Sequence, residues 1–310
     1  MIYAEQLSRF YGDCEAVRDL SFHVHKGEVM GLLGPNGAGK STTMKILTCF
    51  LPPSSGQASV DGSPLEDTMT IRRKIGYLPE NAPSYTDLDV HTHLTFVGRM
   101  HGIPDATLND RIAEMSRVCG LASVMYRRID ELSKGYRQRT GLVASMLHDP
   151  PCLILDEPTT GLDPNQIVEI RHLIRRLGEK KTVLLSSHVL PEVEAACDRM
   201  MIIDNGQLQV IGTSEELARQ AQGGAVLHVA MKGNAEAALD AVTKAMGEVE
   251  AVLRVEDGVS RLTLTHPDHD ANLAEAMFHA VVSSGGVILE MRPEKATLED
   301  IFRQLTGASA

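Results

Sequence analysis

A glycine-rich loop near the N-terminus carries residue types that bind the phosphates of a nucleotide. Its sequence is Gly34-Pro35-Asn36-Gly37-Ala38-Gly39-Lys40-Ser41, and Thr42 follows it. The spacing fits G-x-x-x-x-G-K-[ST], with an apolar strand predicted before the loop and a helix after it. Glycines let successive backbone N–H groups point at phosphates, Lys40 can reach the β- and γ-phosphates, and the Ser41 hydroxyl can ligate Mg²⁺. We therefore predict a nucleotide site built on these nine residues.

Two adjacent carboxylates follow a second apolar run. Asp156 and Glu157 come directly after Cys152-Leu153-Ile154-Leu155 and before Pro158. A strand of this kind ends at the edge of a parallel sheet where ligands bind. Asp156 is placed there to hold Mg²⁺ through water, and Glu157 is placed to polarise an attacking water. The alternative, a pair on a solvated loop, is weak because the preceding residues are apolar.

Two further motifs fit a phosphate site. The run Leu132-Ser133-Lys134-Gly135-Tyr136-Arg137-Gln138 opens a predicted helix. Ser133 is a good N-cap residue, and with the positive end of the helix dipole it suits a γ-phosphate. His188 follows the apolar run at residues 182–185, so it is expected at the same sheet edge. A lone histidine is more often structural than catalytic, but this position favours the phosphate site.

The elements that position these motifs follow from hydrophobic patterning. Residues 2–10 and 17–24 are predicted to form strands of an antiparallel layer. The continuous apolar runs before Asp156 and His188 predict buried parallel strands. Residues 80–145 carry longer amphipathic patterns, which predict a mostly helical insert. This first part of the chain is therefore expected to be of the α/β class.

A change of pattern predicts a second domain. Gln220-Ala221-Gln222-Gly223-Gly224 is the candidate linker. After it we predict strand, helix, two strands, helix and strand, the βαββαβ order of a ferredoxin-like domain, followed by a helix at residues 298–305. The expected organisation is one domain at residues 1–220 and a small α+β accessory domain at residues 225–310.

The bulk composition is that of an ordinary globular protein. The chain has 310 residues, of which 43% are hydrophobic and 23% are charged. Its net charge of -11 argues against a general nucleic-acid binder. No apolar run approaches the ~18 residues that span a bilayer, and we expect no secretory signal. The five cysteines form no CxxC pair, so we expect buried or incidental thiols in a reducing cytosol.

The motifs together resemble the ATP-binding subunit of an ABC transporter, of the kind that pairs with ABC-2-type permeases. The similarity is greatest to the gliding-associated and drug- or sodium-export subgroup, in which an accessory C-terminal domain is common. The resemblance covers roughly residues 1–220 and implies a P-loop NTPase fold with a RecA-like core, an antiparallel β subdomain and a helical subdomain. The matched motifs are Walker A at residues 34–41, the signature at 132–138, Walker B at 152–157, the D-loop with Asp163, and the switch histidine His188.

The resemblance also implies roles and partners. It implies ATP and Mg²⁺ at the site, adenine stacked on Tyr11 with Phe10 as the competing aromatic, and Asp163 at the nucleotide. It assigns catalysis to Glu157, His188 and Lys40. In the family, Ser133 and Gly135 of one subunit close over the phosphate loop of a second subunit, expected here to be an identical chain. An integral membrane permease would hold the dimer at the cytoplasmic face of the membrane, and no nucleic acid is expected.

The chain departs from the family pattern at three positions. Glu80 stands where the family usually has a glutamine that touches the metal and the attacking water. A carboxylate there could ligate Mg²⁺ directly or only through water, and we expect it to keep a role in coupling. Lys134 and Tyr136 replace the commoner glycine and glutamine of the signature, but the serine and glycine that contact phosphate are kept.

The function expected from these residues is ATP hydrolysis that drives a separate ABC-2-type permease, with export favoured over import. The groove that receives the permease is expected in the helical insert beyond Glu80. The alternative is a soluble ABC ATPase that acts on nucleic acid or the ribosome. Such proteins typically carry paired cassettes or a long coiled-coil insertion, whereas this chain has one phosphate loop and no heptad run.

Overall fold

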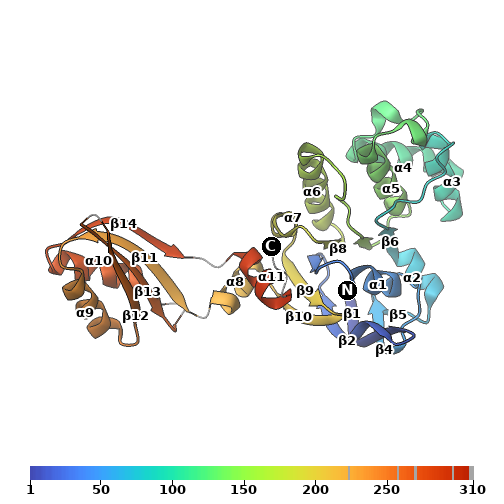
Figure 1. Cartoon of the computed structure of the whole chain (residues 1–310). Helices are drawn as coiled ribbons and strands as arrows, with labels where there is room; N and C mark the ends of the chain where they lie inside the picture. The colour runs from blue at the N-terminus through green and yellow to red at the C-terminus, as the bar shows by residue number, and fades with distance from the viewer. Residues whose placement is uncertain (223, 257, 269–270, 295–296, 307–310) are drawn as a thin grey trace. The chain divides into compact units, whose positions relative to one another are not determined.

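The computed structural model describes residues 1–222, 224–256, 258–268, 271–294 and 297–306. The chain divides into two compact units, a first unit at Met1–Thr213 and a second unit at Ser214–Ala310 (Figure 1). The predicted linker at residues 220–224 is partly wrong, because α8 (Ser214–Gln222) continues through its first three residues. Gln and Ala are good helix formers, which explains why this segment continues the helix. Gly223 lies outside the described residues.

The first unit contains a central six-stranded sheet. Its strands are, in spatial order, β10 (Gln207–Gly212), β9 (Arg199–Asp204), β3 (Val29–Leu33), β8 (Thr182–Ser187), β7 (Cys152–Leu155) and β6 (Ile75–Leu78). All neighbouring pairs are parallel except β9 and β10, which form an antiparallel hairpin. Every residue of β3, β7 and β8 is buried. The two buried parallel strands predicted from continuous apolar runs, β7 and β8, are therefore confirmed.

An antiparallel sheet packs beside this core. Its strands are, in spatial order, β2 (Cys14–Val24), β1 (Ile2–Tyr11), β4 (Ser55–Val60) and β5 (Ser63–Pro64). One hydrophobic cluster joins the two sheets, with Leu7 and Leu20 from this sheet, Leu32 and Ile154 from the central sheet, and Met44 from α1 (Lys40–Leu47). The helix α2 (Thr68–Lys74) follows β5 and leads into β6. This shared core fixes the loop between β3 and α1.

The predicted helical insert is confirmed. Its elements are α3 (Val90–Met100), α4 (Asp105–Val118), the short 3₁₀ helices η1 (Ala122–Val124) and η2 (Ile129–Glu131), and α5 (Lys134–Met146). The three α-helices pack on one another, and α5 also packs against β6. Two helices beyond β7, α6 (Pro164–Gly178) and α7 (Leu190–Ala196), pack on each other and return the chain to the central sheet.

The second unit has the predicted βαββαβ order. Its elements are β11 (Ala225–Lys232), α9 (Ala235–Met246), β12 (Glu250–Glu256), β13 (Val259–His266), α10 (Leu273–Ser283) and β14 (Val287–Glu294). The sheet order is β12-β13-β11-β14 with every neighbouring pair antiparallel. Side chains from α9 and α10 join one face of the sheet in a single core. The last helix, α11 (Leu298–Thr306), packs with α8.

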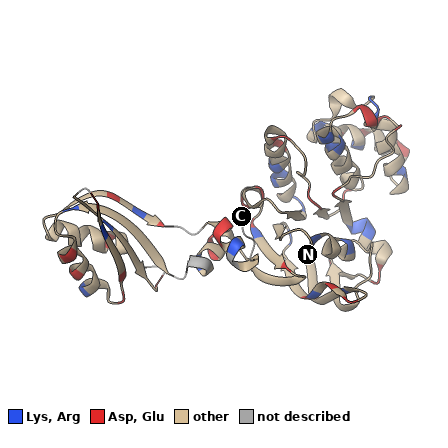
Figure 2. Ribbon diagram, in the orientation of Figure 1, with Lys and Arg blue, Asp and Glu red and all other residues tan. Residues whose placement is uncertain are grey.

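Charged side chains are spread over both units. Lys and Arg are interspersed with Asp and Glu along the ribbon (Figure 2). Among the described residues, no helix combines the length and the apolar character needed to cross a membrane.

Candidate active site

The glycine-rich loop runs from the end of β3 to the start of α1 and borders a cavity of about 390 Å³. Gly37 and Gly39 have φ of 84° and 105°, in the left-handed region that glycine tolerates. A Cβ at Gly39 would lie 2.5 Å from the Ala16 carbonyl oxygen. Glycine is therefore needed at position 39 both for its backbone conformation and for this close approach. The cavity is lined by Ala16, Asn36, Gly37, Ala38, Gly39, Lys40, Ser41, Thr42, Glu80, Glu157, Thr160 and His188.

Lys40 lies inside this loop and is 6% exposed. Its Nζ donates to the carbonyl oxygens of Gly34 at 2.7 Å and Pro35 at 3.2 Å. The ammonium is 3.8 Å from Oε1 of Glu157. Burial lowers the pKa of Lys40, and the charges of Glu157 and Asp156 act in the opposite direction. A buried cation beside the N-terminus of α1 favours an anion in this cavity.

Three oxygen-bearing side chains meet at the C-terminal ends of the strands. The Ser41 hydroxyl donates to Oδ1 of Asp156 at 3.3 Å, and the Ser186 hydroxyl donates to the same oxygen at 2.6 Å. The Asp156 N–H donates to the Leu78 carbonyl oxygen at 2.8 Å, which ties this loop to β6. The two residues predicted to hold Mg²⁺, Ser41 and Asp156, are thus brought together.

Ser186 is a site residue that the sequence reasoning missed. It is completely buried at 0% exposure, and its hydroxyl accepts from the Glu157 N–H at 2.9 Å while donating to Asp156. One hydroxyl therefore positions both acids. The signal was present in the sequence, because a serine at the end of the apolar run in β8 must find hydrogen-bond partners when it is buried.

Glu157 is the centre of a second group of contacts. Its Oε2 lies 2.8 Å from Nδ1 of His188 and accepts from the Thr160 hydroxyl at 3.2 Å. Its backbone φ of 49° is in the left-handed region, which costs a non-glycine residue of order 1–3 kcal/mol. Such strain is typical of functional positions. The structure thus brings Lys40, Glu157 and His188, the three predicted catalytic residues, to one cavity.

The remaining predicted residues lie at the rim of this cavity or away from it. Glu80 follows β6, is exposed, and lines the cavity. Tyr11 lies at the end of β1 with the Arg9 guanidinium 5.0 Å from its ring centroid. Tyr11 is 46% exposed and Phe10 is 39% exposed, so neither is a core aromatic. Bulges interrupt the pairing of β1 with β2 near Arg9, just before these two rings.

The signature residues do not line the cavity of their own chain. Ser133 is exposed and caps α5, accepting from the Tyr136 N–H at 3.5 Å. Asp163 caps α6, accepting from the Gln166 N–H at 3.0 Å. A Cβ at Gly135 would lie 2.6 Å from Oε1 of Gln166, so the signature turn packs directly against the start of α6. Ser133 therefore presents a capped helix N-terminus to solvent.

Lys134 makes a contact that the sequence did not indicate. It is exposed, and a Cβ at Gly161 would lie 2.2 Å from its Nζ. Gly161 has φ of 72°, so glycine is favoured there both by backbone conformation and by this close approach. The signature and the loop between Glu157 and α6 are therefore in contact within one chain.

Comparison with known proteins identifies the family. Residues 17–160 match the family described as ABC transporter. The linearmycin resistance ATP-binding protein LnrL of Bacillus subtilis is 34% identical over 99% of this chain and 98% of its own length. This chain belongs to the ABC transporter ATP-binding subunits. The Nod factor export ATP-binding protein I of Ralstonia nicotianae is 33% identical over 99% of this chain and 94% of its own length.

Solved structures agree with this family. A solved ATP-binding subunit of an ABC transporter has a TM-score of 0.65 at 33% identity, covering 71% of this chain and 92% of its own. A dimeric ATP-binding cassette bound to ADP and Pi has a TM-score of 0.63 and covers 69% of this chain, but at 22% identity it shows the fold alone. The expected α/β P-loop fold and the expected enzyme class are confirmed: the chain is an ABC ATPase associated with transport.

Proposed function

We propose that two copies of this chain hydrolyse ATP with Mg²⁺ and so drive a separate membrane permease. The observation that carries the proposal is the sequence of three residues that begins with the last residue of β6. Leu78 and Pro79 line a groove on one side, and Glu80, the next residue, lines the nucleotide cavity. A partner in the groove and a nucleotide in the cavity would therefore act on adjacent peptide units.

The position of the signature supports a shared nucleotide site. Ser133 and Gly135 lie outside the cavity that contains Lys40, and Ser133 is exposed with its hydroxyl on the first turn of α5. In a head-to-tail pair related by a two-fold axis, each signature faces the other subunit's phosphate loop. The γ-phosphate would then lie between Lys40 and Ser133 of the partner subunit, and Tyr11 would stack on the adenine.

The contacts of Glu157 support its assignment as the general base. Its side chain is 9% exposed, and the Glu157 N–H donates to the Ser186 hydroxyl, which fixes the backbone. His188 holds Oε2 of this carboxylate at 2.8 Å, and Oε1, which lies 3.8 Å from the Lys40 ammonium, would accept the proton of the attacking water. Lys40 and His188 stabilise the charge that develops on the γ-phosphate, with Ser133 of the partner subunit.

The donor set beside the cavity fits Mg²⁺. Ser41 Oγ and Asp156 Oδ1 are hard oxygen ligands 3.3 Å apart, and Mg²⁺ takes few protein oxygens besides phosphate and water. Bound Mg²⁺ would neutralise charge on the β- and γ-phosphate oxygens. Glu80 lines the same cavity and brings a carboxylate that could join this set directly or through water. A Glu80→Gln variant should change the Mg²⁺ dependence of hydrolysis and weaken coupling, and an unchanged variant would exclude a role for the charge.

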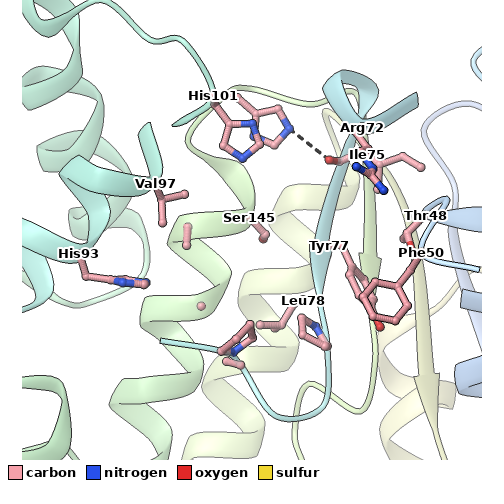
Figure 3. Close-up of a pocket in the computed structure, with 16 residues that line it drawn as sticks. Thr48, Phe50, Arg72, Ile75, Tyr77, Leu78, His93, Val97, His101 and Ser145 are labelled. Atoms are coloured by element: carbon pink, nitrogen blue, oxygen red, sulfur yellow. Dashed lines mark hydrogen bonds between the residues drawn. The ribbon is translucent and has the colours of Figure 1, made fainter. Parts of the chain in front are cut away.

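The groove next to the cavity supports a permease partner. It has a volume of about 570 Å³ and lies between the helical insert and the rest of the first unit (Figure 3). Val97 from α3 and Leu78 from β6 give it apolar walls, and Phe50, which lines it, is 69% exposed. Tyr77 and His93 line the groove, and each has a buried polar atom without a partner in the described structure. An occupant with both apolar and hydrogen-bonding groups, such as a short amphipathic helix of a permease, would fit.

Related proteins suggest the direction of transport. The Escherichia coli relative, 39% identical over 71% of this chain and 38% of its own length, is the probable multidrug ABC transporter ATP-binding protein YbhF. The name of the Nod factor export protein supports export. We propose that the permease holds this chain at the cytoplasmic face of the membrane.

A pull-down in detergent tests the proposal. Tagged chain co-expressed with a candidate ABC-2-type permease should retain that membrane protein. Phe50→Asp in the groove should lose it, whereas Val282→Asp, at a 58% exposed site on α10, should retain it. Recovery of ribosomes or RNA in place of a permease would refute the proposal.

A further inference from the structure

Among the described residues of the second unit, no helix covers one face of the sheet. Leu227, Val229, Leu262 and Leu264 point into the core with α9 and α10. Because side chains alternate along a strand, their neighbours in sequence occupy the opposite face. This open face carries a hollow of about 500 Å³, a volume within the range of small-molecule sites.

The register of the strands gathers arginines around this hollow. Arg254 on β12 lies directly opposite Arg261 on β13, and Arg261 lies opposite Ala230 on β11. In the next row, His228 on β11 pairs with Arg292 on β14. The small side chain of Ala230 lines the hollow on the central strand β11, and all three arginines line it as well.

The charges of this hollow are not balanced within the described structure. The guanidinium groups of Arg254 and Arg292 make no ion pair or hydrogen bond with another described residue, and the Arg261 guanidinium has only a distant contact of 3.8 Å with Glu256. Like charges directly opposite on neighbouring strands destabilise a sheet. Among the residues that line the hollow, the three arginines outnumber the one acid, Glu290, which lies opposite Ala230. Glu294, which does not line the hollow, lies 2.6 Å from Nε2 of His228.

We propose that this hollow, the arginine hollow, binds a small polyanion with carboxylate or phosphate groups at two ends. Arg254 and Arg261 would hold one end. Arg292, which lies opposite His228 in the neighbouring row while Glu290 lies directly opposite Ala230, would hold the other end. Guanidinium groups bind carboxylates and phosphates through paired hydrogen bonds, and an anion between Arg254 and Arg261 removes their repulsion. The second unit is then a ligand-binding domain, independent of the nucleotide site.

Calorimetric titration of the full chain tests this proposal. The cassette is first saturated with ADP in the absence of Mg²⁺, and the probes are citrate for carboxylates and inorganic pyrophosphate for phosphates. We expect at least one probe to bind with a single site per chain. Arg254→Ala should weaken binding about tenfold, which corresponds to ~1.4 kcal/mol.

Two further variants distinguish specific binding in the hollow from nonspecific attraction of an anion to positive charge. Arg219→Ala removes an exposed arginine of α8 in the same unit and should leave binding unchanged. Ala230→Leu keeps every charge but fills the hollow, and it should abolish binding while circular dichroism stays unchanged. The proposal is overturned if neither probe binds, if Arg219→Ala weakens binding as much as Arg254→Ala, or if Ala230→Leu binds normally.

Discussion

Ser186→Ala tests whether one buried hydroxyl holds both acids of the catalytic loop. The substitution removes a 2.6 Å hydrogen bond to the Asp156 carboxylate and leaves the Glu157 N–H without its acceptor. A lost bond to a charged group costs about 1.5–3 kcal/mol, and a buried orphan donor costs about 1–3 kcal/mol. Because the two penalties share one site, we expect the first unit to lose about 3 kcal/mol of stability.

Urea unfolding followed by circular dichroism measures this loss, and steady-state ATPase assays measure its effect on catalysis. We expect kcat to fall more than the KM for ATP rises, because the glycine-rich loop and Lys40 are untouched. Ser145→Ala is the matched control, since that buried hydroxyl bonds only the Leu142 carbonyl oxygen of its own helix. If Ser186→Ala is as stable and as active as Ser145→Ala, the positioning role of Ser186 is wrong.

Three further predictions concern separate parts of the first unit. Glu157→Gln should reduce ATP hydrolysis by at least about a thousandfold and make an ATP-bound dimer accumulate on size-exclusion chromatography; normal turnover would exclude Glu157 as the base. Burial, with the charge of His101, lowers the pKa of His148 to about 4. The unfolded chain therefore binds this proton at a higher pH than the folded chain does. As a result, the free energy of unfolding falls as the pH is lowered from about 6.5 to 4. His148→Phe should reduce this pH-dependent loss of unfolding free energy by up to about 3 kcal/mol, measured by unfolding at a series of pH values. Gly161→Ala should displace Lys134 and lower kcat, and pairing it with Lys134→Gly should recover part of the loss.

Local sequence patterns were sufficient to predict the parts of the site that lie within one segment of the chain. The glycine-rich loop is followed by α1, and the acids after β7 stand where an apolar strand predicts them, because strand and helix periodicity are properties of neighbouring residues. The order of strands and helices in the second unit could be predicted for the same reason. The motifs then placed Lys40, Glu157 and His188 at one sheet edge, as the structure confirms.

Contacts between segments that are distant in the sequence could not be predicted from local patterns. The role of Ser186 depends on β7 lying beside β8, and the contact of Lys134 with Gly161 depends on how α5 meets the following loop. The bulges of β1 that precede Phe10 and Tyr11 are also not marked by any residue pattern. The arginine hollow likewise needs the register of four strands, which brings Arg254 and Arg261 opposite each other.

Subunit complementation tests the shared nucleotide site most directly. Lys40→Ala disables the phosphate loop and Ser133→Arg disables the signature, so each variant alone should be inactive. In a mixed dimer, the intact loop of one chain faces the intact signature of the other. Random mixing should restore about a quarter of the wild-type ATPase rate, because half of the dimers are mixed and each has one intact site of two. A mixture as inactive as its components, or a Ser133→Arg variant active by itself, would contradict a site shared between two chains.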